Sequence, residues 1–165
     1  MYRLRVFTTG GTIDKVYFDA LSAYQVGEPA VAQIFRSMRV ELTYEITPLM
    51  KKDSLDLTDG DRETICQAVI EAPQSKILIT HGTDTMARTG LALQQALASQ
   101  PDKRVVLTGA LLPGAFRETD AVFNVGFALG ALQAMGGGVR VAMNGRLFDP
   151  SRVRKDREAG RFVDA

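Results

Sequence analysis

The clearest indication of the fold is the stretch Leu4-Arg5-Val6-Phe7-Thr8-Thr9-Gly10-Gly11-Thr12, in which a short apolar run ends in two glycines flanked by hydroxyl side chains. A second stretch follows the same plan, because Ile77-Leu78-Ile79 leads into Thr80-His81-Gly82-Thr83-Asp84. Short apolar runs bounded by glycine or polar residues are typical of strands buried on both faces of a parallel sheet. In such a sheet both stretches would end at the same edge, which is where ligands bind.

The rest of the chain alternates between short apolar runs and longer amphipathic ones. Strands are expected at 4–9, 40–47, 76–80, 104–108 and 139–143, and helices at 29–38, 58–72, 85–99 and 119–135. Thr58 suits the N-cap of its helix. This alternation predicts an α/β fold, an open and mostly parallel Rossmann- or flavodoxin-like sheet with helices on both faces. We expect residues 1–165 to form one domain, and the polar, Arg-rich segment from Arg146 gives no clear prediction.

Composition excludes several classes of protein. Twenty Lys and Arg against nineteen Asp and Glu leave a net charge of +1, so nucleic acid and anionic membranes are not expected partners. One cysteine excludes a disulfide within the chain, and one cysteine with one histidine excludes the usual zinc ligand sets. We expect neither a metal nor a cofactor. The first residues do not resemble a signal peptide and no run of about 18 apolar residues occurs, which favours a cytoplasmic protein.

The residue types at the expected sheet edge limit the chemistry. The chain has neither a G-x-G-x-x-G nor a P-loop pattern, so a phosphate site is not indicated. Hydrolysis of an amide needs a nucleophile, a group that accepts its proton and N–H donors for the oxyanion. The only histidine, His81, precedes a glycine turn and no G-x-S-x-G elbow is present, which favours a structural role for His81. A threonine nucleophile here would need activation by Tyr, Lys or a carboxylate.

The two stretches together resemble the bacterial-type L-asparaginases. Thr9-Gly10-Gly11-Thr12-Ile13 is similar to the first signature of that family, and Thr80-His81-Gly82-Thr83-Asp84-Thr85-Met86 is similar to the second. The similarity continues through Asp53-Ser54, Gly109-Ala110 and Val141-Ala142-Met143-Asn144 to Lys155. It corresponds to the larger, N-terminal domain of the family, and we expect the family's smaller C-terminal domain to be absent.

The resemblance implies roles for five catalytic residues. Thr12 would attack the carbon of the side-chain amide, and Tyr24 would be the lid tyrosine that assists Thr12. Thr83, Asp84 and Lys155 would form a second group that acts in proton transfer or on the hydrolytic water. We therefore expect these five side chains to converge on one small molecule.

The resemblance also implies how the substrate is held. Ser54 would bind the α-carboxylate and Asp84 the α-ammonium group. Backbone N–H groups near Thr83 and Ala110 would stabilise the oxyanion. Gly11 and Gly82 would let the backbone approach the ligand closely.

The same residues also admit structural interpretations. Tyr24 could be a surface tyrosine, Ser54 could shape a turn, and Lys155 could belong to a solvated run of charges. Cys66 is expected to be an inert core thiol. The apolar residues Phe123, Phe127, Leu129 and Leu132 are expected in the core.

The resemblance predicts hydrolysis of L-asparagine to L-aspartate and ammonia through a threonine acyl-enzyme, with L-glutamine as an alternative substrate. A different class of function is a non-catalytic module that binds aspartate or asparagine with half of the site. A third is a transamidation subunit that frees ammonia for transfer to tRNA-bound glutamate, which the near-zero net charge disfavours. The resemblance also implies a homo-oligomer, and we favour a dimer.

Overall fold

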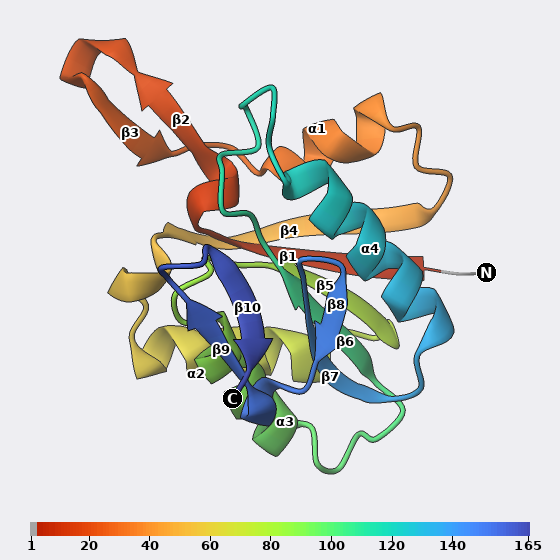
Figure 1. Ribbon diagram of the computed structural model, residues 1–165. Coiled ribbons are helices and arrows are strands. Elements are labelled where there is room, and N and C mark those ends of the chain that lie inside the picture. The colour runs from red at the N-terminus through yellow and green to blue at the C-terminus, as the bar shows by residue number, and fades with distance from the viewer. Residues whose placement is uncertain (1–2) are drawn as a thin grey trace.

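A six-stranded sheet lies at the centre of the computed structural model, which describes residues 3–165 (Figure 1). Its strand order is β4-β1-β5-β6-β7-β8. Neighbouring strands from β4 to β7 are parallel, and β8 pairs with β7 in the antiparallel sense. The strands are β1 (Arg3–Gly10), β4 (Thr43–Lys52), β5 (Lys76–Thr80), β6 (Arg104–Thr108), β7 (Gly138–Met143) and β8 (Arg146–Phe148). The predicted open, mostly parallel sheet is confirmed.

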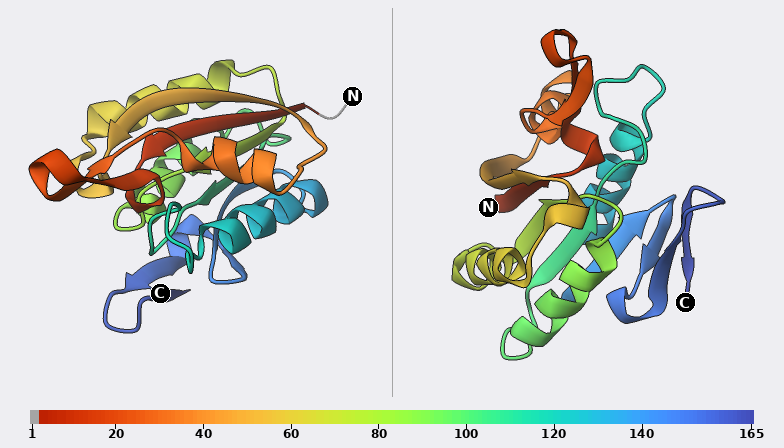
Figure 2. Two further views of the ribbon diagram at one scale, coloured as in Figure 1. Left: turned by 90° about the horizontal axis from the view of Figure 1, so that it is seen from above. Right: turned by 90° about the vertical axis from the view of Figure 1, so that its left-hand side faces the viewer.

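Helices cover both faces of this sheet (Figure 2). On one face α1 (Ala30–Ser37) and α4 (Ala121–Ala134) bury Phe35 and Val125 against Val6 and Val106. On the other face α2 (Asp59–Glu71) and α3 (Met86–Ala96) pack their apolar side chains against β5, β6 and β7. Within residues 3–165 no helix is both long enough and apolar enough to cross a lipid bilayer.

The order in which the chain adds strands to the sheet reverses between β1 and β5. The chain runs from β1 through α1 to β4 on one side of β1, and then through α2 to β5 on the other side. The connections that follow β1 and β5 leave to opposite sides, and the carboxyl ends of two such strands form a crevice. This crevice is the usual ligand site of an open α/β sheet. Both glycine stretches follow these two strands, and Thr8 is the register partner of Thr80.

The structure corrects the prediction for the second strand. We expected a strand at 40–47, whereas β4 spans Thr43–Lys52. Pro48 lies inside β4, and proline is tolerated there because β4 is the edge strand of the sheet. Val40 and Leu42 precede β4 but still pack against the core on the α1 side.

Two hairpins were not predicted. The first joins β2 (Lys15–Phe18) to β3 (Ala23–Val26) and projects away from the sheet (Figure 1). The second joins β9 (Val153–Asp156) to β10 (Arg161–Asp164), in the Arg-rich segment that carried no clear prediction. Val153 and Phe162 anchor this second hairpin, because both side chains are buried in the core.

The helix predictions have one error in the core. The N-cap of α2 is confirmed, because the Thr58 hydroxyl accepts from the N–H of Asp61 at 3.1 Å and the Thr58 N–H donates to the Asp61 carboxylate at 2.8 Å. Leu129 and Leu132 are buried as expected and Phe127 is half-buried. Phe123 is 62% exposed, so its assignment to the core is wrong. Helix α4 is apolar on nearly all sides, and its periodicity therefore does not identify the outer face.

Candidate active site

Four loops meet at the carboxyl edge of the sheet, and glycines let their backbones touch. A Cβ atom on Gly11 would lie 2.4 Å from the Cα atom of Gly82. A Cβ atom on Gly82 would lie 2.6 Å from the Cβ atom of Ser54, and one on Gly109 would lie 2.3 Å from the carbonyl oxygen of His81. The loops after β1, β4, β5 and β6 are therefore packed backbone to backbone.

The first glycine stretch turns sharply at this edge. Gly10 and Gly11 have φ angles of 100° and 84°, in the region that favours glycine. The Gly11 N–H donates to the carbonyl of Lys52 at 2.9 Å, and the chain then enters a single 3-10 turn, Thr12–Asp14. Thr12 is half-buried and directly follows the residue that contacts Gly82. The structure thus brings the segments that carry Thr12 and Thr83 to one place.

The second stretch carries a charged cluster, which we call the Lys155 cluster (Thr83, Asp84, Lys155 and Arg157). The Lys155 ammonium group donates to the Thr83 hydroxyl at 2.7 Å and to the Asp84 carboxylate at 3.0 Å. The Lys155 and Asp84 side chains are only 19% and 21% exposed, which protects their pairing from solvent screening. Lys155 comes from β9, so the second hairpin completes this part of the site.

Arg157 belongs to this cluster and was missed from the sequence. Its Nη2 atom lies 3.0 Å from the Asp84 oxygen that also binds Lys155. Arg157 lies in the turn after β9, so the alternation of side chains along this strand does not indicate its position. Two cations around one carboxylate leave one excess positive charge at the site, which favours a negatively charged group on a ligand.

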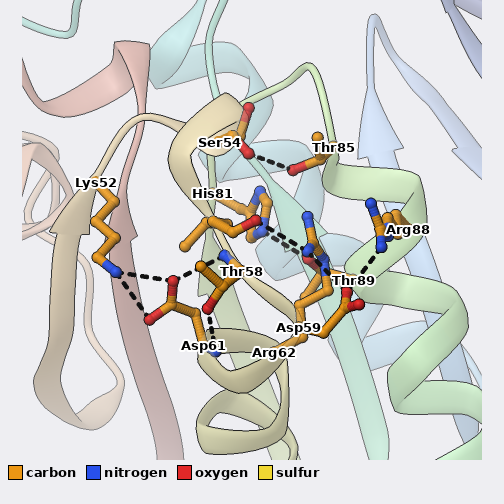
Figure 3. A network of polar contacts seen from close by, with 11 residues as sticks. Lys52, Ser54, Thr58, Asp59, Asp61, Arg62, His81, Thr85, Arg88 and Thr89 are labelled. Carbon is orange, nitrogen blue, oxygen red and sulfur yellow. Dashed lines mark hydrogen bonds and ion pairs between the residues drawn. The ribbon is translucent and has the colours of Figure 1, made fainter.

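Ser54 fixes the start of the second loop. Its buried hydroxyl oxygen accepts from the N–H of Asp84 at 3.1 Å. The Thr85 hydroxyl donates to the Ser54 carbonyl at 2.8 Å (Figure 3). The Ser54 hydroxyl still has its own proton to donate, so it can bind a carboxylate while it holds Asp84 in position.

His81 is a structural residue, as the sequence favoured. The side chain is fully buried, with Nδ1 2.6 Å from the carbonyl oxygen of Gly82 and Nε2 2.8 Å from the hydroxyl oxygen of Thr89 (Figure 3). Burial lowers the pKa of His81 to about 4, against the effect of the Gly82 carbonyl and with a further contribution from the charge of Arg62. Both ring nitrogens are engaged, so the ring holds the loop and is not a base for Thr12.

Ala110 lies buried in the loop after β6, and the start of α4 holds this loop. The Asp120 carboxylate accepts from the backbone N–H groups of Leu111 at 2.9 Å and Leu112 at 3.0 Å. The amide nitrogen of Asn124 donates to the carbonyl of Gly109 at 3.0 Å. The backbone at Ala110 is therefore fixed on both sides.

Tyr24 lies outside the Lys155 cluster, in the projecting hairpin. The side chain is 50% exposed, and its ring packs on Tyr17 and Phe116 with centroids 5.4 and 6.0 Å apart. An ion pair of 2.6 Å between Lys15 and Asp53 ties the base of this hairpin to the loop that carries Ser54. Of the five side chains expected to converge, Thr83, Asp84 and Lys155 are in direct contact, and the turn that carries Thr12 touches the loop of Thr83 through Gly11 and Gly82.

Asp14 is a second residue that sequence reasoning missed. The side chain is only 3% exposed and accepts a hydrogen bond of 2.8 Å from the N–H of Ala30, at the start of α1. Burial raises the pKa of Asp14 to about 7, although the Ala30 N–H and Lys51 act in the opposite direction. Its position two residues after Thr12 was the available signal. In the part of the chain that the structure describes, no three His, Cys, Asp or Glu side chains are grouped as metal ligands.

Comparison with known proteins gives concordant results. A family model described as "Asparaginase, N-terminal" matches residues 3–161. An L-asparaginase from Thermococcus kodakarensis is 34% identical over 165 residues, which covers 96% of this chain and 49% of that protein. The solved structure of the thermostable L-asparaginase from Thermococcus kodakarensis superimposes with a TM-score of 0.86 at 30% identity, covering 98% of this chain and 51% of that one. A glutamyl-tRNA(Gln) amidotransferase subunit from Aeropyrum pernix is 31% identical over 158 residues, which covers 89% of this chain and 36% of that protein. The chain thus spans about half the length of the L-asparaginases it matches.

Proposed function

This chain belongs to the asparaginase family, and we propose that it hydrolyses the side-chain amide of L-asparagine to L-aspartate and ammonia. The observation that carries the proposal is the contact between Gly11 and Gly82, which joins the Thr12 turn to the loop that bears the Lys155 cluster. Thr12 follows Gly11 and Thr83 follows Gly82, so a hydroxyl residue lies on each side of this contact. In the proposed reaction Thr12 forms the acyl-enzyme and Thr83 acts in its hydrolysis.

Thr12 is the nucleophile in this proposal. Its hydroxyl oxygen bonds to the amide carbon, the C–N bond breaks, and the hydroxyl proton leaves with the nitrogen as ammonia. The backbone N–H groups of Thr83 and Ala110 stabilise the oxyanion. Both residues lie in loops that the Gly82 and Gly109 contacts hold rigid, which supports this role because an oxyanion hole must be preorganised.

Hydrolysis of the resulting ester is assigned to the Lys155 cluster. The Thr83 hydroxyl accepts from Lys155 at 2.7 Å, so its own proton and its second lone pair remain available to orient a water molecule. Attack by that water releases the aspartate side chain and returns a proton to Thr12. The pairing of Lys155 with Asp84 keeps both groups oriented during the cycle.

Substrate binding uses groups of both charges. The Ser54 hydroxyl can donate its proton to the α-carboxylate of the substrate, and the Lys155 ammonium group lies in the same site. The α-ammonium group binds Asp84, where it competes with Arg157, which is exposed and free to move away. Gly11 and Gly82 let the loops around the ligand pack closely, because a Cβ atom on either residue would collide with a neighbouring loop.

Tyr24 acts as a lid residue in this proposal. Closure of the β2–β3 hairpin would carry its hydroxyl toward Thr12 and away from Phe116, and Tyr17, its partner on the same hairpin, would move with it. A projecting hairpin tied down mainly at its base, through Lys15 and Asp53, is suited to such a movement. A homodimer and a cytoplasmic location stay predictions.

The test is release of ammonia from L-asparagine by the purified chain and its variants. We expect Thr12→Ala to lower kcat at least about a thousandfold, because it removes the nucleophile. Lys155→Met should lower kcat by a factor of about 100 to 10,000, because it removes a group that acts on a proton in transit. The control Thr43→Ala removes an exposed hydroxyl at the start of β4 and should leave the rate unchanged.

Two other outcomes would redirect the assignment. Calorimetric binding of L-aspartate without any turnover of asparagine would make the chain a binding module that keeps half of the site. The similarity to an amidotransferase subunit makes glutamine the substrate to compare. Ammonia release from L-glutamine but not from L-asparagine would favour the transamidation alternative.

A further inference from the structure

A groove of about 590 Å³ separates α2 from α3 on the face of the sheet opposite α1 and α4. Its walls include Arg62 and Cys66 from α2 and Arg88, Leu91, Ala92 and Ala96 from α3. None of these residues is assigned to the active site. The groove therefore offers a second place where a small molecule could bind.

Arg62 brings an incompletely paired charge to this groove. The residue is only 4% exposed, and its guanidinium group lies between α2 and α3 (Figure 3). Its Nη1 atom donates to the carbonyl of Leu57 at 3.1 Å and lies 3.4 Å from a carboxylate oxygen of Asp59. The Nε and Nη2 atoms are buried and have no hydrogen-bond acceptor among residues 3–165. Buried donors on a charged group are costly to leave unpaired.

The two unpaired donors form one edge of the guanidinium group. Their N–H bonds point in parallel, and this edge matches the two oxygens of a carboxylate. The nearby Asp59 carboxylate does not fill that edge, because it binds Nη2 of Arg88 at 2.7 Å and faces the opposite donor of Arg62. Asp59 and Arg88 are 76% and 63% exposed, so this pair can move aside for a ligand at little cost.

Apart from the charged residues at the Arg62 end, the groove is lined by the apolar side chains of Leu91, Ala92 and Ala96 and by the polar side chains of Glu63 and Gln95. Leu91 is 40% exposed, and Ala92 and Ala96 are half-buried against the core beneath α3. An aliphatic group of a few carbon atoms attached to a carboxylate would cover these apolar side chains and Cys66. We propose that the groove between α2 and α3 binds a small aliphatic carboxylate, with the Nε and Nη2 atoms of Arg62 as its bidentate partner.

Cys66 gives the readout, because it is the only cysteine in the chain and lines the groove. The residue is 9% exposed and burial raises the pKa of its thiol, so the alkylation is run slowly at alkaline pH. The probe is 3-methylbutanoate, and its neutral amide is the matched control. Alkylation of Cys66 by iodoacetamide is followed by intact mass. At ten times its dissociation constant the carboxylate should slow alkylation about elevenfold, since only about one molecule in eleven then has an empty groove. The amide should give little protection.

Two variants separate the contributions. Arg62→Lys keeps the charge but loses the paired donors, and we expect binding of the carboxylate to weaken at least about tenfold. Ala92→Phe fills the apolar wall with Arg62 intact and should abolish protection, which keeps the test valid if Arg62→Lys does not fold. In the Thr12→Ala variant 3-methylbutanoate should protect Cys66 as well as it does in the unmodified chain. This result would separate binding in the groove from the activity of the proposed active site.

Three results would overturn the proposal. Equal protection by the amide would mean that the groove selects only apolar bodies. Equal protection by inorganic phosphate would mean that Arg62 attracts any anion. Absence of protection at high concentrations of 3-methylbutanoate would mean that the groove does not bind small carboxylates.

Discussion

The stability of this protein should depend on pH through Asp14, and Asp14→Asn tests this dependence. The carboxyl group is 3% exposed, and its Oδ1 atom accepts from the N–H of Ala30 at 2.8 Å. Burial raises its pKa from 3.8 to about 7, a further rise comes from Glu28, and the Ala30 N–H and Lys51 oppose both. The folded protein therefore holds a proton on Asp14 over a range in which the unfolded chain has lost it.

The sign and size of the effect follow from linkage. The folded state binds more protons than the unfolded state between about pH 4 and 7, so the contribution of Asp14 to stability is greatest below pH 3.8 and is lost as the pH rises to about 7. The interval from 3.8 to about 7, at about 1.4 kcal/mol for each pH unit, gives a total loss of about 4 kcal/mol. Asn keeps an oxygen that accepts from Ala30 but does not ionise.

The assay is urea unfolding of both proteins at about pH 4.5, 6, 7 and 8. We expect the stability of Asp14→Asn relative to the unmodified chain to rise by about 3 to 4 kcal/mol from the lowest pH to the highest. The titration of His81 cancels in this comparison because both proteins contain it. Asp19→Asn, an exposed change in the nearby β2–β3 hairpin, should show a flat difference. A difference for Asp14→Asn that stays constant within about 1 kcal/mol would mean that folding does not change the protonation of Asp14.

Three other substitutions have defined outcomes. Lys103→Met should lower the free energy of unfolding by about 2 kcal/mol, because the ammonium group donates to three carbonyls at the end of α2 at 2.5 to 3.2 Å; urea unfolding measures this loss. Gly82→Ala should abolish binding of L-aspartate in calorimetry, because its Cβ atom would lie 2.6 Å from that of Ser54. The control Gly126→Ala meets nothing within 4 Å and should bind normally. Phe116→Ala removes a ring contact with the β2–β3 hairpin and should speed amide hydrogen exchange there, measured by mass spectrometry.

The fold was predictable wherever local sequence determines local structure. The strands at 76–80 and 104–108 read as apolar runs because both of their faces are buried, and Thr58 marks the start of α2 through its capping hydrogen bonds. The glycines before Thr12 and Thr83 pointed to the sheet edge where their loops meet. In the structure Gly11 and Gly82 are in direct contact, so the two loops meet at that edge.

The remaining elements depend on contacts that the sequence does not display. The β9–β10 hairpin is held by Val153 and Phe162, two apolar residues in a charged segment, and only the folded core shows where they pack. Lys155 therefore looked like a member of a charged run, and only the resemblance assigned it to the site. The β2–β3 hairpin has exposed side chains on both faces, so no alternation of apolar and polar residues indicates it. Tyr24 lies on this hairpin, and its distance from the Lys155 cluster could not be foreseen.

In the proposed reaction Thr12 and the Lys155 cluster act on one bound molecule. A crystal structure of the chain with L-aspartate bound would show whether they do. We expect one aspartate with its side-chain carboxylate within hydrogen-bond distance of the Thr12 hydroxyl and its α-ammonium group on Asp84. An aspartate that contacts Asp84 while its side chain points away from Thr12, or two aspartates bound separately, would rule out a shared site.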